Sequence, residues 1–372
     1  MTNRIKQIQA LGQAIWFDYI SRQLLDSGEL ADLVEEGVTG VTSNPTIFHH
    51  AIAGSTDYDD EITRLIRADK STNEIYEALV VRDIRDAADV LRPVYNETHG
   101  RDGFVSIEVS PRLAHDTDGT IAEARRLHKT IERPNVMIKV PATPEGIPAI
   151  STLLGEGICV NVTLIFSIVV YEHVMQAYLD GLRTYAKTGK PLGLVSSVAS
   201  FFVSRVDTLT DNVLLHRVQH GEGHLEPLMG LAAVANAKLA YAKFKQVFGG
   251  EQFGDLRAAG ARVQRPLWAS TSTKSPSYPD TKYVDPLIGV NTVNTVPPET
   301  LRALRDHAVV AQTIEQDLAN AQAVMNELGG IKVDMEWVTG CLLEEGVKKF
   351  ANSFDALMQA IDEKRANLQA SV

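Results

Sequence analysis

Residues 135–146 read NVMIKVPATPEG, a strand-like run followed by turn residues. Val136 to Val140 has the apolar composition of a strand buried on both faces, as in parallel sheets covered by helices. Lys139 lies inside this run and points to the side opposite Ile138, because side chains alternate along a strand. Burial disfavours an ammonium charge, and a neutral amine is a nucleophile for carbonyl groups. The alternative is an edge strand whose lysine reaches solvent.

Composition narrows the class of protein. The chain has 372 residues, a net charge of −11 and a hydrophobic fraction of 44%, which is ample for a large core. The acidic balance argues against nucleic acid or anionic membrane as a partner, although a small anionic substrate remains compatible. The only cysteines, Cys159 and Cys341, suggest a reducing cytoplasm rather than a disulfide framework. The apolar run 158–175 is interrupted by polar residues, which favours a buried strand and helix over a membrane span.

Strand-like runs alternate with helical segments along the chain. The expected strands are 14–18, 37–42, 104–109, 136–140, 158–163, 192–200, 267–270 and 287–293, and helical periodicity is clear in 60–94 and 226–248. Such alternation implies parallel strands with right-handed crossovers, and eight units predict a closed (β/α)8 TIM barrel. An open doubly wound sheet is the alternative, but its glycine-rich first turn is missing. We expect a single catalytic domain over 1–372, with 297–372 mostly helices packed outside the barrel.

Polar residues lie inside or just after several of these strands, where barrel enzymes build their active sites. They are Asp18, Asn44, Glu108, Lys139, Asn161, Thr163, Ser196 and Ser200. A lysine with two carboxylates and no metal-ligand cluster can form a Schiff base with a ketone and break the adjacent carbon–carbon bond. HRVQHGEGH (216–224) carries three histidines, but its glycines break the helix that would align them, so we expect no metal site.

Four segments together resemble the transaldolase family, in its longer bacterial subgroup. They are GVTSNPTIF (within 37–48), VMIKVPATPEG (136–146), NVTLIFS (161–167) and SFFVSRV (200–206). The similarity extends from about residue 14 to 295. It implies a cofactor-free class I aldolase-type enzyme of the non-oxidative pentose phosphate pathway. Such an enzyme moves a dihydroxyacetone unit from sedoheptulose 7-phosphate to glyceraldehyde 3-phosphate, giving erythrose 4-phosphate and fructose 6-phosphate.

The resemblance also implies roles for individual residues. Lys139 is expected to be the Schiff-base nucleophile, Asp18 the base for carbon–carbon cleavage, and Glu108 the proton shuttle, acting through a water held by Thr163. The expected substrate-binding residues are Asn44, Asn161, Ser200, Phe202 and, for the phosphate, Arg205.

The sequence departs from the shorter transaldolases after the seventh strand. There they carry an arginine close behind an Ala-Ser pair, whereas here Ala269-Ser270 is followed by TSTK. Barrels often bind phosphate in this region, so Ser270 and Lys274 are the expected phosphate ligands.

Two other functions remain open from the sequence. An aldolase that releases free dihydroxyacetone from fructose 6-phosphate uses the same imine chemistry. A barrel that only binds sugar phosphates forms no covalent adduct, and leaves the combination of Lys139, Asp18 and Glu108 unexplained. The expected partners are small phosphorylated sugars, and the sequence does not predict the oligomeric state.

Overall fold

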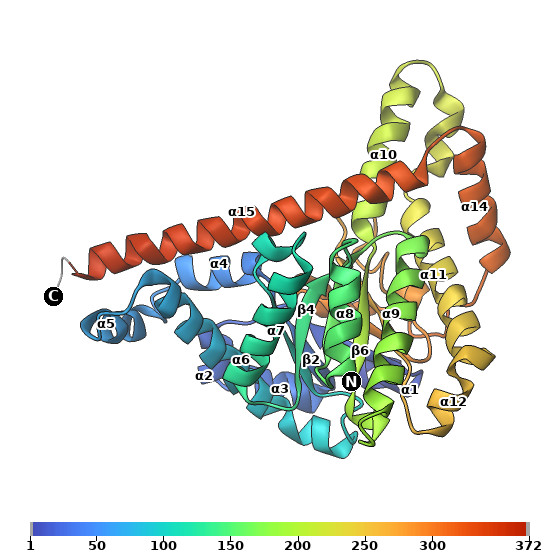
Figure 1. Ribbon diagram of the computed structural model, residues 1–372. Helices are drawn as coiled ribbons and strands as arrows, with labels where there is room; N and C mark the ends of the chain where they lie inside the picture. Colours follow the sequence, from blue (N-terminus) through green and yellow to red (C-terminus); the bar gives the residue numbers. More distant parts are fainter. Residues whose placement is uncertain (1–2, 370–372) are drawn as a thin grey trace.

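The computed structural model describes residues 3–369, and its centre is a closed barrel of eight parallel strands. Each strand pairs with its neighbours in chain order, and the last pairs with the first. Figure 1 shows strands of the barrel at the centre of the molecule, with helices around them. The barrel confirms the predicted fold class and excludes the open sheet. The strands are β1 Gln13–Phe17, β2 Val38–Thr42, β3 Phe104–Glu108, β4 Val136–Pro141, β5 Val160–Ile165, β6 Ser197–Phe202, β7 Arg265–Ala269 and β8 Thr292–Val296.

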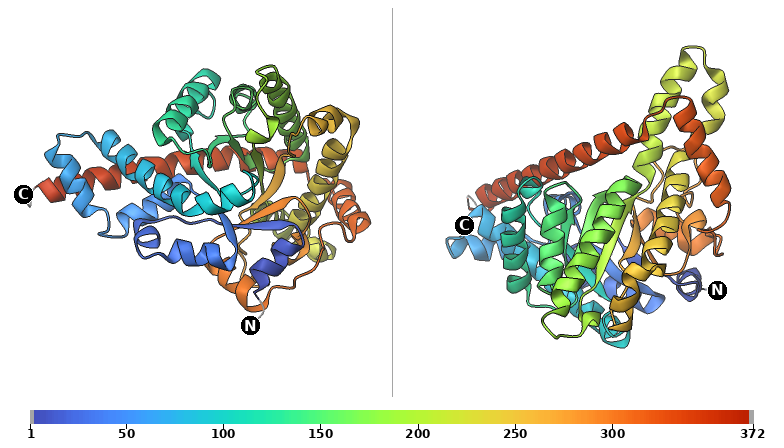
Figure 2. Two further views of the ribbon diagram at one scale, coloured as in Figure 1. Left: turned by 90° about the horizontal axis from the view of Figure 1, so that it is seen from below. Right: turned by 45° about the vertical axis from the view of Figure 1, so that its right-hand side comes forward.

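Helices follow the strands and surround the barrel, as Figure 2 shows from below and from the side. The first half of the chain supplies α1 Arg4–Ala10, α2 Arg22–Asp26, α3 Glu29–Glu36, α4 Pro45–Ala53, α5 Asp59–Arg67, α6 Thr72–Glu97, η1 Pro111–Leu113, α7 Thr117–Ile131, α8 Gly146–Gly155 and α9 Ile168–Ala186. The second half supplies η2 Leu192–Leu194, α10 Ser204–Gln219, η3 Gly223–Leu228, α11 Ala232–Gly249, η4 Glu251–Phe253, α12 Gly254–Ala258, η5 Asp285–Leu287, α13 Pro298–His307, α14 Leu318–Gly330 and α15 Met335–Gln369. None of the helices within residues 3–369 is long and apolar enough to cross a membrane.

Two predicted strands were misplaced. The run 192–200 begins with the short helix η2, and the strand itself, β6, starts at Ser197. The apolar run 287–293 starts at the end of η5, and β8 forms only from Thr292 onward. The carbonyl of Leu287 accepts hydrogen bonds from the Gln13 amide (2.7 Å) and the Trp268 indole (3.1 Å), so this segment packs as a buried turn instead of pairing as a strand.

The expected continuous helix over 60–94 is divided into α5 and α6. Asp69 has a positive φ of 55°, a conformation that a helix does not tolerate. Ser71 then starts α6 with a capping box, in which its side chain and that of Glu74 each satisfy the other's backbone amide. The expected helix 226–248 is likewise shorter, because α11 begins at Ala232 after η3.

The position of α15 was not foreseen. This helix of 35 residues lies across the end of the barrel and contacts α4, α6, α10 and β5 (Figure 1). Gly346 permits this close approach, since a Cβ atom there would lie 2.8 Å from the Leu164 side chain. Phe350, one turn further along, is buried against the same end of the barrel. The C-terminal helix therefore closes over the carboxyl ends of the strands.

Candidate active site

Lys139 lies at the centre of the site, on β4, with only 5% of its surface exposed. Because β4 pairs with β3 on one side and β5 on the other, the edge-strand alternative is excluded. The Lys139 ammonium donates a hydrogen bond to the Ser43 carbonyl at 3.0 Å, and it lies 3.7 Å from Glu108 Oε2. The amine thus contacts Ser43, just after β2, and Glu108 on β3, and it lies 5.8 Å from the centre of the Phe350 ring.

Asp18 directly follows β1 and extends its ladder, since its backbone amide donates to the Val296 carbonyl. The Thr42 hydroxyl donates to Asp18 Oδ1 at 2.6 Å, and Thr42 in turn contacts the Thr295 hydroxyl at 2.6 Å. Burial raises the pKa of Asp18, whereas the positive charge of Lys139 and the Thr42 hydrogen bond act against this rise. These opposing effects make Asp18 a candidate acid–base group.

Glu108 ends β3, in register with Lys139 on β4. Burial raises its pKa to about 7, although the neighbouring Lys139 charge favours the ionised form. Glu108 Oε2 and the hydroxyl of Thr163, on β5, are buried and have no hydrogen-bond partner among residues 3–369. A carboxyl group with a pKa near neutrality can exchange protons at physiological pH, which makes Glu108 a candidate acid–base group.

Asn161 lies in the barrel interior, in register with Lys139, and is fully buried. Its side-chain oxygen accepts a hydrogen bond from Ser200 at 2.7 Å, and its amide donates to Ser106 at 2.9 Å. The three side chains connect β3, β5 and β6 across the barrel. Asn161 does not line the main cavity, whereas its hydrogen-bond partner Ser200 does.

A cavity of about 370 Å³ opens beside Lys139 at the carboxyl ends of the strands. Its wall contains most of the predicted site residues, namely Asp18, Asn44, Lys139, Thr163, Ser200, Phe202, Arg205, Ser270 and Lys274. Glu108 lines an adjoining smaller cavity instead. Asn44 also caps α4, since its side chain accepts a hydrogen bond from the Ile47 amide at 3.0 Å. Ser196, which we expected at the level of Ser200, precedes β6 and lies at the opposite end of the barrel.

Three cations share the outer part of this cavity. Arg205 begins α10 and its guanidinium lies 5.1 Å from the centre of the Phe202 ring, while Lys274 donates to the Ser272 hydroxyl at 2.6 Å. Lys349 reaches the cavity from α15. Burial lowers the pKa of all three groups, and the charge of Arg205 lowers those of both lysines further. Converging positive charges are typical of a phosphate site.

Several cavity residues were not predicted from the sequence. Lys349 and Phe350 come from a helix far along the chain, and nothing in its periodicity indicates which part meets the barrel. Thr42 was a detectable candidate, because it is a polar residue at the carboxyl end of a predicted strand. Within residues 3–369, no group of three or more His, Cys, Asp or Glu side chains is placed to hold a metal ion. His216 and His220 instead stack on each other along α10.

Comparisons with known proteins agree with this geometry. The model of the family described as Transaldolase/Fructose-6-phosphate aldolase matches residues 15–361. A protein named Transaldolase from Acidothermus cellulolyticus is 49% identical over 363 residues, covering 97% of this chain and 96% of the relative. Proteins of the same name from Thiobacillus denitrificans (48% identical, 96% and 99% covered) and Trichodesmium erythraeum (45% identical, 98% of each covered) are similar throughout. The chain belongs to the transaldolase/fructose-6-phosphate aldolase family of enzymes.

Proposed function

We propose that this enzyme is a transaldolase that works through a Schiff base on Lys139. The donor is sedoheptulose 7-phosphate and the acceptor glyceraldehyde 3-phosphate, and the products are erythrose 4-phosphate and fructose 6-phosphate. The observation that carries the proposal is the buried Lys139 amine, 3.7 Å from a glutamate whose pKa is raised to about 7 and beside a cavity that Asp18 also lines. Neither a metal nor a cofactor is required for this chemistry.

The reaction begins when the Lys139 nitrogen attacks the C2 carbonyl of the ketose. The resulting carbinolamine loses its hydroxyl group as water, and this step needs a proton donor. Glu108 supplies the proton through a water bound by Thr163. Two observations support this role: the pKa of Glu108 is raised to about 7, and Oε2 of Glu108 and the Thr163 hydroxyl are buried without hydrogen-bond partners among the described residues. Buried polar groups are almost always hydrogen-bonded, which favours a bridging molecule at this place.

Cleavage follows from the positive charge of the iminium group. Asp18 removes the proton of the C4 hydroxyl, the C3–C4 bond breaks, and its electron pair moves toward the iminium to give an enamine on Lys139. The aldose phosphate leaves. The enamine carbon then attacks the aldehyde of the acceptor, and Asp18 returns the proton to the new hydroxyl. Hydrolysis of the second iminium releases the product and restores the lysine.

The phosphate group of each substrate binds the three cations of the cavity. Arg205 and Lys274 were expected from the sequence, and Lys349 of α15 joins them. In this proposal α15 supplies part of the positive charge that the shorter transaldolases obtain from an arginine after the seventh strand. The Ser270 and Ser272 hydroxyls lie on the same wall and can donate hydrogen bonds to phosphate oxygens.

Trapping the imine tests the proposal directly. The protein is incubated with fructose 6-phosphate, reduced with borohydride and digested, and the modified peptide is identified by mass spectrometry. A three-carbon adduct on Lys139 is expected, together with its loss in Lys139→Ala. An exposed lysine, Lys348, provides the matched control, since Lys348→Ala should keep the adduct. Failure to trap any adduct, or an adduct on a different lysine, would remove the Schiff-base mechanism.

The family description also names fructose-6-phosphate aldolase, which uses the same covalent intermediate. The two activities differ in what accepts the three-carbon unit. A transaldolase needs an aldose phosphate for turnover, whereas the aldolase releases free dihydroxyacetone to water. Measuring dihydroxyacetone release with and without glyceraldehyde 3-phosphate distinguishes them. We propose the transferase, acting on small phosphorylated sugars in the cytoplasm.

A further inference from the structure

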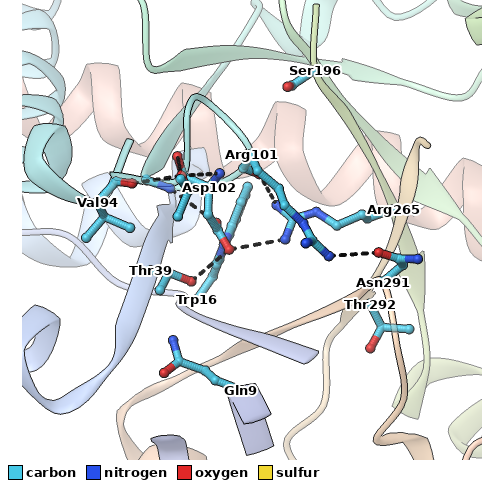
Figure 3. A network of polar contacts seen from close by, with 12 residues as sticks. Gln9, Trp16, Thr39, Val94, Arg101, Asp102, Ser196, Arg265, Asn291 and Thr292 are labelled. Carbon is cyan, nitrogen blue, oxygen red and sulfur yellow. Dashed lines mark hydrogen bonds and ion pairs between the residues drawn. The ribbon is translucent and has the colours of Figure 1, made fainter. Parts of the chain in front are cut away.

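A second cavity, of about 250 Å³, lies at the end of the barrel opposite Lys139. Arg265 begins β7, Ser197 begins β6 and Arg101 shortly precedes β3, so this cavity lies among the amino ends of the strands. Three arginines line it: Arg101, Arg262 and Arg265. In Figure 3 Arg101 and Arg265 lie side by side, with Asn291 and Asp102 flanking them. We call this cavity the basal arginine pocket.

One of its three positive charges is neutralised within the protein. Arg265 is 7% exposed and forms an ion pair with Asp102 Oδ2 at 3.1 Å. Asp102 is itself held in place, because it accepts hydrogen bonds from the Trp16 indole (2.7 Å) and the Thr39 hydroxyl (3.1 Å), as Figure 3 shows. On this side of the pocket the charge of Arg265 is therefore paired with that of Asp102, and Trp16 and Thr39 hold Asp102 in position.

The other two charges have only neutral partners. Arg101 donates to the Asn291 side-chain oxygen at 2.8 Å, and Arg262 donates to the His99 carbonyl at 2.5 Å. Within residues 3–369 no ion pair joins either guanidinium to a carboxylate. Burial lowers the pKa of Arg262, the nearby Tyr95, Tyr178 and Cys159 side chains act against this, and the positive charge of Arg101 lowers it further. Two like charges are thus held together by carbonyl and amide oxygens that orient them but do not neutralise them.

We propose that the basal arginine pocket binds a dianionic phosphate group, either inorganic phosphate or the phosphate of a small monoester. Its two unpaired positive charges match the charge of such a group in its dianionic form, which predominates for a phosphate monoester above its second pKa of about 6. Arginine presents a planar fork of donors that suits phosphate oxygens, and phosphate can accept from several forks at once. A single carboxylate, with one charge and two oxygens, leaves one guanidinium uncompensated.

This site is separate from the catalytic phosphate site. The two cavities lie at opposite ends of the same strands, and a strand of five residues such as β7 spans about 16 Å. Binding at the base therefore stabilises the folded chain by mass action without occupying the cavity that holds Lys139. The inference does not depend on the proposed reaction.

Radiolabelled inorganic phosphate in equilibrium dialysis tests the proposal, at constant ionic strength set with chloride so that general screening is the same in all samples. The triple variant Arg205→Gln/Lys274→Gln/Lys349→Gln first removes the three cations of the catalytic phosphate site. In this background we expect one phosphate per chain to remain bound. Adding Arg101→Gln and Arg262→Gln should weaken that remaining binding by about tenfold or more. Arg302→Gln, which removes an exposed arginine of α13 outside the pocket, should leave it unchanged.

Two further measurements complete the test: one uses a variant that preserves the charge, and the other identifies the source of the phosphate. Arg262→Lys preserves the charge but removes the planar fork, so it should weaken binding even if the double glutamine variant fails to fold. Unlabelled glycerol phosphate identifies the source of the phosphate: displacement of the label shows that the pocket admits monoesters, and retention shows that it takes inorganic phosphate alone. The proposal is overturned if the Arg205→Gln/Lys274→Gln/Lys349→Gln background retains no phosphate. It is also overturned if the arginine substitutions of the pocket do not weaken binding.

Discussion

Replacing Glu108 with glutamine should make the folded protein more stable at alkaline pH while making it less active. The pKa of Glu108 is raised by burial from 4.5 to about 7 in the folded chain. Between these two values the folded chain holds a proton that the unfolded chain has released. The free energy of unfolding therefore falls as the pH rises through this range, because deprotonation leaves a buried carboxylate. Glutamine has no such proton to lose.

The size of the effect follows from the two pKa values. Their difference corresponds to about 3 kcal/mol, at 1.36 kcal/mol for each tenfold change in proton affinity. The stability advantage of Glu108→Gln over the wild type should thus grow by about 3 kcal/mol between about pH 5 and pH 8. The substitution also removes the ion pair with Lys139, which itself changes the free energy of unfolding. The informative quantity is therefore the change of the stability difference with pH and not its value at one pH. Turnover should fall by about 10²–10⁴-fold, the usual range for loss of an acid–base group.

Chemical denaturation of wild type and variant at a series of pH values measures this change. Glu35→Gln is the matched control, because Glu35 is exposed on α3 and its replacement should leave the pH dependence as in the wild type. If the wild type and Glu108→Gln keep a constant stability difference across this range, Glu108 is not protonated near neutrality. The proton-shuttle role argued from its burial would then have no basis.

Three further substitutions test other parts of the site. Asp18→Ala should still form the imine but lower turnover by about 10²–10⁴-fold, so borohydride should trap a six-carbon adduct from fructose 6-phosphate in place of the three-carbon one. Lys349→Ala should raise KM for glyceraldehyde 3-phosphate about tenfold, because it removes a charge-assisted contact, with no such rise for unphosphorylated glyceraldehyde or in Lys348→Ala. Gly40→Ala should cost about 1–3 kcal/mol in urea denaturation, since its Cβ would lie 2.5 Å from the Trp16 ring.

The barrel could be predicted from the sequence because its pattern of a strand followed by a helix is visible in short windows and recurs along the chain. Alternation of strands and helices needs only short windows, and eight repeats exclude most other folds. The errors fell where tertiary contacts outweigh local pattern. The run that includes Leu287 and Ile288 has the composition of a strand, yet its backbone oxygens bond to Gln13, Trp268 and Thr313, which hold it as a turn.

The candidate site was predictable to the extent that it lies on the strands. Lys139 and Thr163 are polar residues inside strands and Asp18 directly follows one, and the barrel topology alone brings them to one cavity. Lys349 was not predictable, because its place depends on the course of a helix that follows the last strand. Asn161 shows a further difficulty: periodicity places it on the inner face but does not reveal that two serines already bind its amide.

The course of α15 also bears on how the molecule is made. Residues 335–369 follow all eight strands in the chain, so the barrel can close during synthesis before this helix has left the ribosome. Phe350 contacts the Lys139 region only across a very long stretch of sequence, and contacts of that kind form late. A nascent barrel would therefore leave Lys139 accessible at the carboxyl ends of the strands, and the wall that α15 adds to this cavity would be the last part of it to form.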